Sequence, residues 1–327
     1  MFTVRPYQAA DQEGWDALCA QAEQATLLHT RRFLSYHGDR FVDRSLLIEE
    51  GGALVGAFPA AEHPSDRTHV VSHPGITYGG ILHSGALRGE RMLNALAAIT
   101  NYFSSQGYTR LTYKVVPVFY HRIPSQDDIY ALFRLGAVRV RCDLSSTIDL
   151  SNRGSVSQRR RRSLKKAYKA DVRITTDVGD LSGLWEVLSE NLARKHGVSP
   201  VHSLSEITVL SERFPENIQC VCGKLNGKVV AGVLFFATPT AHHAQYIASN
   251  ELGYQVSALD MVFEYCIEQA SQLQKKWFDF GISTEAGGTM LNESLYRFKT
   301  EFGAGGFVHE FYEIELGKKL CQFMIRN

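Results

Sequence analysis

The chain has 327 residues and a formal net charge of +1, and 44% of its residues are hydrophobic and 21% charged. This composition is typical of a globular protein with a sizeable core and excludes a disordered chain. No apolar run approaches the ~20 residues that a membrane helix needs, and the first twenty residues lack the apolar core of a signal peptide, so we expect a cytoplasmic protein without membrane insertion.

In the first half, apolar runs and turn residues predict a hairpin followed by alternating helices and strands. Two apolar runs flank Gly51-Gly52, which indicates a tight turn. Further along, apolar residues recur first at helical spacing and then in alternation. The predicted elements are a hairpin at 45–60, a helix at 90–106, a strand at 108–116, a helix at 127–135 and a strand at 138–150.

The segment 152–171 is strongly basic, with four consecutive arginines, three lysines and no acidic residue before its last position. On a helix, Arg159, Arg162 and Lys166 share one face. Two interpretations stay open. The face binds the phosphates of a nucleotide sugar, of coenzyme A or of tRNA, or it is a solvated helix surface.

The second half repeats the order of the first. Asn226-Gly227 lies between two apolar runs, the strongest short hairpin signal, and Ser257 with Asp260 three residues later predicts a capped helix start. The predicted elements are a helix at 181–195, a hairpin at 218–237, a strand at 241–249, a helix from 257, a strand at 276–281, a helix at 292–302 and a strand at 307–316.

The two halves also share local sequence, which indicates a duplicated unit of roughly 150 residues. Residues 129–137 and 148–150 of the first half parallel 295–304 and 314–316 of the second. We therefore predict an N-terminal domain at 1–151, a basic connecting helix at 152–172 and a C-terminal domain at 173–327. The expected fold class is α/β (α+β), with a mixed, mostly antiparallel sheet flanked by helices in each domain.

Candidate catalytic residues gather where the strand Phe278 to Gly281 ends, since strand ends are where α/β proteins place their chemistry. Lys299 could bind a phosphate or stabilise an oxyanion, or it could be a solvated lysine. Asp279 and Glu285 could each take a proton from an attacking ammonium, or serve as edge and capping carboxylates. His242 could act as a general base, or it could equally be a hydrogen-bonded residue of the core.

Candidate binding residues are polar and aromatic groups on the predicted strands and loops. Such surfaces can bind carbohydrates and nucleotides. The alternative is that the tyrosines pack in the interior and the polar residues form turns. The second-half candidates are Tyr246, Ser249, Asn250, Ser283 and Asn292, and those of the first half are Tyr78, Tyr113, Lys114, Tyr120, His121 and Arg122. Cysteines show no metal-ligand spacing, and Cys220 and Cys222 fit a core strand, so we expect no metal.

Several of these segments together resemble the FemAB-like branch of the GNAT acyltransferases, of the type found in surface-polysaccharide biosynthesis. The resemblance rests on Phe278-Asp279-Phe280-Gly281, Asn292, Phe298-Lys299 and Phe302-Gly303, with His242, Tyr246, Ser249, Asn250, Tyr120-His121 and 125–128 in support. It implies two tandem GNAT-like domains and transfer of an acyl group to an amine without a metal.

The resemblance leaves the acyl donor open. Coenzyme A sites of the common GNAT pattern place a glycine-rich turn before a helix, where backbone N–H groups hold the pyrophosphate. The corresponding stretch at 250–258 has one glycine. We consider three hypotheses: acyl transfer, with acyl-CoA as donor, to an amino sugar or nucleotide-linked amino sugar; aminoacyl transfer from charged tRNA; and a non-catalytic GNAT pair that binds a nucleotide sugar.

Overall fold

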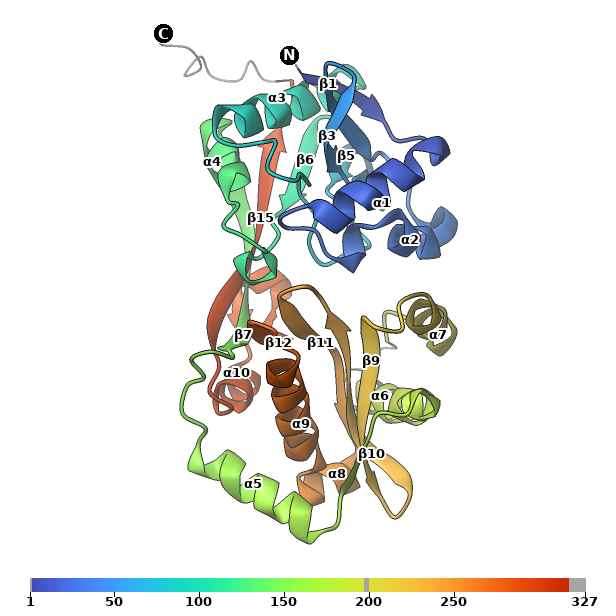
Figure 1. The fold of residues 1–327 in the computed structure, drawn as a ribbon, viewed down its shortest axis with the longest axis vertical. Helices are drawn as coiled ribbons and strands as arrows, with labels where there is room; N and C mark the ends of the chain where they lie inside the picture. Colours follow the sequence, from blue (N-terminus) through green and yellow to red (C-terminus); the bar gives the residue numbers. More distant parts are fainter. Residues whose placement is uncertain (1, 197–199, 318–327) are drawn as a thin grey trace. The chain divides into compact units, whose positions relative to one another are not determined.

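The computed structural model describes residues 2–196 and 200–317, which divide into two compact units (Figure 1). Within the described residues, unit 1 comprises 2–143, 286–289 and 308–317, and unit 2 comprises 144–285 and 290–307. Each unit is a mixed α/β structure with its own hydrophobic core.

Unit 1 contains a three-stranded antiparallel sheet and a second group of strands in the order β4-β5-β6-β15. Within that group β5 and β6 are parallel, whereas β4 with β5 and β6 with β15 are antiparallel. The strands are β1 (Phe2–Pro6), β2 (Leu46–Glu50), β3 (Ala53–Phe58), β4 (Ala61–His63), β5 (Asp66–Val71), β6 (Arg110–Lys114) and β15 (Gly305–Glu315), and the helices are α1 (Gln12–Gln21), α2 (Arg31–Leu34), α3 (Glu90–Ser105) and α4 (Asp127–Arg134).

Unit 2 contains strands in the order β7-β12-β11-β10-β9-β8, with α9 on one face and α6 and α7 on the other (Figure 1). The strands are β7 (Val138–Asp149), β8 (Arg173–Thr175), β9 (Ile218–Leu225), β10 (Lys228–Ala237), β11 (Ala241–Ser249), β12 (Trp277–Ile282), β13 (Thr284–Glu285) and β14 (Met290–Leu291). The helices are α5 (Gln158–Lys169), α6 (Leu181–His196), α7 (Leu204–Arg213), α8 (Glu251–Val256), α9 (Ala258–Gln272) and α10 (Glu293–Thr300). Short 3-10 turns lie at Ala9–Asp11, Leu27–His29, Ser35–Arg40, Val118–Tyr120, Val178–Asp180 and Ala286–Gly288.

Both cores follow the apolar stripes that the sequence predicts. In unit 1, α3 buries Leu93, Leu96 and Phe103 against strand residues. In unit 2, α9 buries Val262 and Phe263 against a cluster of aromatic side chains from β10, β12 and the end of α10. No described helix combines the length and hydropathy that crossing a membrane requires. The five cysteines of the described residues are free thiols, and Cys321 lies outside those residues.

The two sequence repeats exchange their last strands, so the unit boundaries differ from the predicted domain boundaries. The last strand of the first repeat, β7, pairs antiparallel with β12 and buries Ile148 in the core of unit 2. The last strand of the second repeat, β15, pairs antiparallel with β6 and buries Ile314 in the core of unit 1. Local sequence specifies a strand but not its partner, which is why the prediction cut the chain at 151 and 173.

The helix predicted from Ser257 is present as α9, but its predicted side-chain cap is absent. Ser257 has a φ of 60°, lies between α8 and α9, and makes no capping hydrogen bond with its side chain. The helix α8 begins earlier, where the Asn250 carboxamide oxygen accepts the Gly253 N–H at 2.9 Å. The left-handed residue redirects the chain, so a short helix that the pattern did not predict precedes α9.

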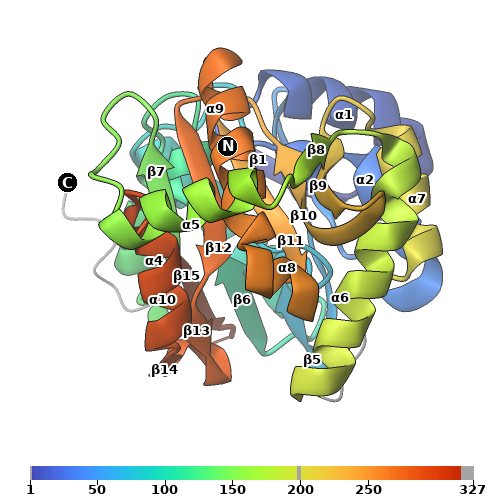
Figure 2. The ribbon, with the colours of Figure 1, turned by 90° about the horizontal axis from the view of Figure 1, so that it is seen from below.

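The basic helix α5 belongs to unit 2 and runs beside α8 and α9 (Figure 2). Ser157 caps its first turn by accepting the Arg160 N–H at 3.2 Å. Arg160 turns inward, donating to Asp260 at 2.6 Å and to Glu301 at 2.9 Å. The Arg160 and Asp260 side chains are 6% and 8% exposed, so one arginine of the run anchors the helix while the others stay on its surface.

We expect Arg160→Met to lower the free energy of unfolding by about 3–5 kcal/mol, because it leaves a buried carboxylate without its cation. Urea denaturation would measure the change. Arg161→Met is the matched control, since the neighbouring Arg161 is exposed, and we expect it to change the free energy of unfolding by less than about 0.5 kcal/mol. Equal effects of the two substitutions would contradict the anchoring role.

Candidate active site

The candidate site forms in unit 2 where two neighbouring parallel strands stop pairing. β11 and β12 share three paired positions, ending at His243 with Asp279, although both strands continue beyond them. β11 is irregular here: Phe235 pairs with Ala244 but Leu234 pairs with Tyr246, so Gln245 forms a bulge. Within these described strands, the backbone groups past the third pair take no part in the parallel ladder.

The third pair carries a hydrogen-bonded imidazole and carboxylate. The distance between His243 Nδ1 and Asp279 Oδ2 is 2.6 Å. Because a carboxylate only accepts, Nδ1 carries the hydrogen, and Nε2 is the basic nitrogen of the neutral ring. Ser145 and Thr147 of β7 donate their hydroxyls to Asp279 Oδ1 at 2.5 and 2.8 Å. Asp279 is fully buried and the His243 side chain is 13% exposed, so a fixed carboxylate orients an imidazole that solvent reaches.

The structure does not bring His242, the candidate base named from the sequence, to Asp279. His242 points into the core, where its ring stacks on Phe235 with 4.7 Å between the ring centroids. Neither ring nitrogen has a hydrogen-bond partner among the described residues, and burial lowers the pKa of His242 to about 4. Alternation along the strand sends His243, the adjacent residue, to the opposite face.

Strict alternation would place His242 and Tyr246, four residues apart, on one face of β11, but the bulge separates them. One extra residue reverses the alternation, and Tyr246 packs edge-on against Trp185 of α6 with 4.9 Å between centroids. Its hydroxyl bonds to His202, and burial raises the pKa of Tyr246 to about 12. Ser249 is buried and donates to the Val230 carbonyl at 3.4 Å. With Asn250 serving as a helix cap, these binding candidates have structural partners.

Lys299 supports the end of β12 rather than an open site. Its ammonium donates to the carbonyls of Gly281 at 2.8 Å and Ile282 at 2.6 Å. It is 3% exposed, and burial lowers its pKa to about 8. Gly281 has a φ of 77°, and a Cβ there would lie 3.5 Å from the His243 ring. Lys299 thus secures the glycine turn that passes beside the imidazole.

The remaining second-half candidates follow this turn. Glu285 is exposed and accepts the Asn292 amide at 2.9 Å, and Asn292 caps α10 by accepting the Leu295 N–H at 3.1 Å. Ser283 is buried, and its hydroxyl has no partner among the described residues. Glu285 and Asn292 therefore close the connection into α10, whereas Ser283 retains an unused hydroxyl.

Unit 1 lacks the imidazole–carboxylate pair at the corresponding register. β5 and β6 also share three parallel pairs, and the third joins Val71 with Thr112. Two residues after Thr112, Lys114 stands where unit 2 has Gly281, and its ammonium donates to the carbonyls of His73, at 3.2 Å, and Ile76. Burial lowers the pKa of Lys114 to about 7. Lys114 thus stabilises the turn that follows β6 in this unit.

The other first-half candidates are mostly buried. Tyr113 donates to Asp128 at 2.9 Å inside the core, and Tyr78 donates to Thr26 at 3.1 Å. The rings of Tyr78 and Tyr120 lie 4.6 Å apart. His121 is 9% exposed, and its Nε2 bonds to the Val116 carbonyl at 2.9 Å. Arg122 is exposed and donates to the Ala20 carbonyl at 2.7 Å.

The phosphate-binding candidates Arg159, Arg162 and Lys166 lie exposed on α5. Arg159 has Glu301 at 3.9 Å. Sequence reasoning missed His243, Ser145, Thr147 and the inward direction of Arg160. Strand alternation relative to Asp279 could have identified His243, whereas nothing in the local pattern places β7 next to β12.

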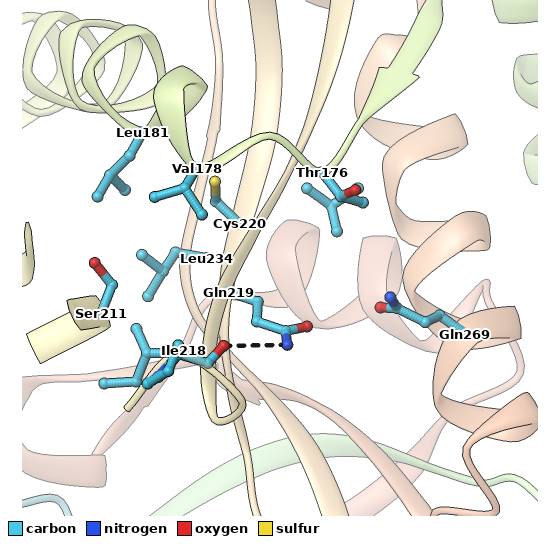
Figure 3. Close-up of a pocket in the computed structure, with 11 residues that line it drawn as sticks. Thr176, Val178, Leu181, Ser211, Ile218, Gln219, Cys220, Leu234 and Gln269 are labelled. Carbon is cyan, nitrogen blue, oxygen red and sulfur yellow. Dashed lines mark hydrogen bonds between the residues drawn. The ribbon is translucent and has the colours of Figure 1, made fainter. Parts of the chain in front are cut away.

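A separate cavity of about 330 Å³ lies at the β9 edge of unit 2. Figure 3 shows Cys220, Val178, Leu181 and Leu234 on one side of the strand, with Gln219 and Gln269 on the other. Gln219 donates to the Pro215 carbonyl at 3.3 Å. The lining contains no candidate named from the sequence and neither member of the imidazole–carboxylate pair, so this cavity is distinct from the site at β11 and β12.

Comparison with known families and structures supports the fold. The acetyltransferase (GNAT) domain model matches residues 151–299, which include His243, Asp279 and Lys299. No curated protein matches the sequence. The crystal structure of FemX is similar at 11% identity and a TM-score of 0.68, covering 98% of this chain and 99% of that one.

Two further structures share the fold over most of their length. L-PGS from Bacillus licheniformis has 12% identity and a TM-score of 0.62, covering 92% of this chain and 90% of that one. A tandem GNAT protein from the clavulanic acid biosynthesis pathway has 10% identity and a TM-score of 0.53, covering 96% and 98%. Residues 151–299 therefore match the acetyltransferase (GNAT) domain model, and the fold of the chain is similar to that of a tandem GNAT protein.

Proposed function

We propose that this acyltransferase transfers an acyl group, typically acetyl, to an amine of a sugar or nucleotide-linked amino sugar in cell-surface polysaccharide biosynthesis. The observation that carries the proposal is the His243–Asp279 pair at the point where β11 and β12 separate. An amine is a nucleophile only when deprotonated, and an imidazole held by a carboxylate is suited to remove that proton at neutral pH.

The proposed reaction is direct transfer. His243 Nε2 takes a proton from the amine as its nitrogen attacks the acyl carbonyl. The new C–N bond forms, the bond between the carbonyl carbon and the leaving group breaks, and the imidazolium returns its proton to the leaving group. Atoms and charge balance without a covalent enzyme intermediate, so the protein contributes proximity, orientation and proton transfer.

The neighbouring residues act as positioning residues in this mechanism. Ser145 and Thr147 hold Asp279 Oδ1, which leaves Oδ2 to fix the His243 tautomer. A buried carboxylate with these partners stabilises the imidazolium that forms when the proton is taken. Lys299 holds the two carbonyls after Phe280, so it fixes the turn against which the imidazole lies.

A coenzyme A donor is supported by the family but only in part by the residues present. The first turn of α8 lacks a glycine-rich loop, carries Glu251, and already satisfies the Gly253 N–H through Asn250. That helix end does not fit a pyrophosphate. Cationic side chains of the adjacent α5, among them Arg162 and Lys166, are the residues that would meet the phosphates instead.

The exposed face of α5 also favours a second candidate, aminoacyl transfer from charged tRNA. Outside Arg159 and Arg160, the cations of this helix form no ion pair with a carboxylate of the described residues, and a solvated basic surface suits an RNA backbone. The chemistry at His243 would be the same, because an aminoacyl ester and a thioester both present a carbonyl to the amine.

We expect Asp279→Asn and His243→Asn each to lower kcat by about 10²- to 10⁴-fold, because the base loses its orientation or is removed. Thiol release from acetyl-CoA, with D-glucosamine and UDP-glucosamine as acceptors, would measure this. The control is His242→Phe: its ring is buried without hydrogen bonds, so we expect kcat to change less than about threefold. A large loss in the control and none in His243→Asn would refute the assignment of the base.

We expect the double variant Arg162→Glu, Lys166→Glu to raise the KM for acetyl-CoA about tenfold, because the charge-assisted contacts to phosphate are lost. The KM for S-acetylpantetheine, which lacks those phosphates, should not change. The double variant Arg67→Glu, Lys228→Glu, at two exposed cations outside α5, controls for the same change in net charge. If the KM values of both donors rise alike, or if neither KM changes, α5 does not bind the phosphates.

A further inference from the structure

Unit 2 contains two cysteines, Cys220 and Cys222, that the proposed mechanism does not use. Both belong to β9 and lie two residues apart, so the alternation of the strand places their side chains on the same face. They are 6% and 0% exposed, and both are free thiols. This burial agrees with the core strand predicted from the sequence, but a cavity adjoins one of the two residues.

Cys220 lines the cavity of about 330 Å³ at the edge of β9, whereas Cys222 is not part of its lining. The Cys220 sulfur lies beside Val178 in Figure 3. None of the side chains that line the cavity is charged, so the cavity suits a small neutral molecule. Such a molecule meets Cys220 first, and Cys222 lies further from the cavity along the same face of the strand.

The sheet holds β9 more firmly at Cys222 than at Cys220. Cys222 pairs with Gly232 of β10 on one side and with Thr175, the last residue of β8, on the other. Cys220 pairs with Leu234 of β10, and β8 ends before it reaches the position opposite Cys220. A displacement of the strand at Cys220 therefore disturbs one neighbouring strand, whereas a displacement at Cys222 disturbs two.

The two thiols interact with each other. Cys220 Sγ lies 3.7 Å from the Asp177 carbonyl oxygen and Cys222 Sγ lies 4.0 Å from the Asp180 carbonyl oxygen, to which each can donate its hydrogen. Cys222 can instead donate to Cys220, and this hydrogen bond lowers the pKa of Cys220 and raises the pKa of Cys222. Cys220 is therefore the thiol that loses its proton first, and the thiolate is the form that attacks a disulfide.

We propose that Cys220 and Cys222 form a thiol–disulfide exchange site, at which a small neutral disulfide oxidises the pair to an intramolecular disulfide. The Cys220 thiolate attacks one sulfur of the incoming disulfide. A new S–S bond forms, the old one breaks, and the small thiolate that leaves takes up the proton that Cys220 lost. Cys222 then loses its proton and attacks Cys220 Sγ, which releases the second small thiol. Two protein thiols and one small disulfide become one protein disulfide and two small thiols, so atoms and electrons balance.

The spacing of the pair allows the second step. A strand rises about 3.3 Å per residue, so the Cα atoms of Cys220 and Cys222 lie roughly 6.6 Å apart. Disulfides join Cα atoms up to about 6.8 Å apart, so the pair lies near the upper limit of this range. Closing the bond draws the two residues slightly together, and the cavity beside Cys220 leaves room for that displacement.

Peptide-resolved mass spectrometry on the full chain, after incubation with 2-hydroxyethyl disulfide, would test the site. We expect the peptide that contains Cys220 and Cys222 to lose two hydrogens, and dithiothreitol to restore them. Cys142 is the internal control: it is partly exposed and has no neighbouring cysteine in the sequence, so it can add the small thiol but cannot close a ring. Suppose that the pair keeps both hydrogens at a disulfide concentration that oxidises it in the urea-unfolded chain. The proposal is then overturned.

Two variants distinguish the attacking cysteine from the resolving one. In Cys222→Ser we expect Cys220 to retain one added small thiol, because no second thiol displaces it. In Cys220→Ser we expect Cys222 to react at least about tenfold more slowly than Cys220 does in Cys222→Ser, because Cys222 does not line the cavity. Equal rates, or a faster reaction at Cys222, would overturn the order of attack. The experiment on the unsubstituted chain needs neither variant to fold.

This inference stands apart from the proposed function. The readout is the mass of one peptide and involves no acyl donor or amine. Failure of acyl transfer would leave the exchange site untouched, and an unreactive pair of thiols would leave the assignment of His243 and Asp279 untouched.

Discussion

The site in unit 2 depends on where two parallel strands stop pairing. A full parallel ladder between β11 and β12 would bury both strands and consume their backbone groups. The bulge at Gln245 and the left-handed Gly281 end the ladder after the pair His243–Asp279. The imidazole therefore lies at the last paired position, rigid through its neighbours in the sheet and still partly open to solvent.

Unit 1 has a similar pair of parallel strands but lacks the imidazole and the carboxylate at the last paired position. Its parallel pair also ends after three positions, but Val71 and Thr112 cannot exchange a proton, and the lysine at the following turn donates to nearby carbonyls. The two units thus share this pair of parallel strands and differ in the residues at one register. Chemistry depends on the side chains placed on a fold, so a shared strand pair does not imply the same chemistry in both units.

Periodicity predicted much of the fold because helices such as α3 and α9 bury one continuous stripe, and strands such as β7 alternate. It did not predict the exchange of β7 and β15, because partner choice depends on contacts far apart in sequence. The candidate site remains a prediction. Asp279 was named from its strand end, and the structure pairs it with His243 rather than His242. Choosing between the two histidines requires knowing which face of β11 meets the core, and strict alternation cannot reveal a one-residue bulge.

The buried carboxylates of the chain differ in how many hydrogen-bond donors and cations support them. Asp260 has a buried arginine, and Asp279 has two hydroxyls and an imidazole, so each is supported within its own unit. Glu23 has a cation at one oxygen only, and that cation is shared with Asp127. A carboxylate oxygen is costly to bury without a donor, so the fold supports Glu23 less fully than it supports Asp260 and Asp279.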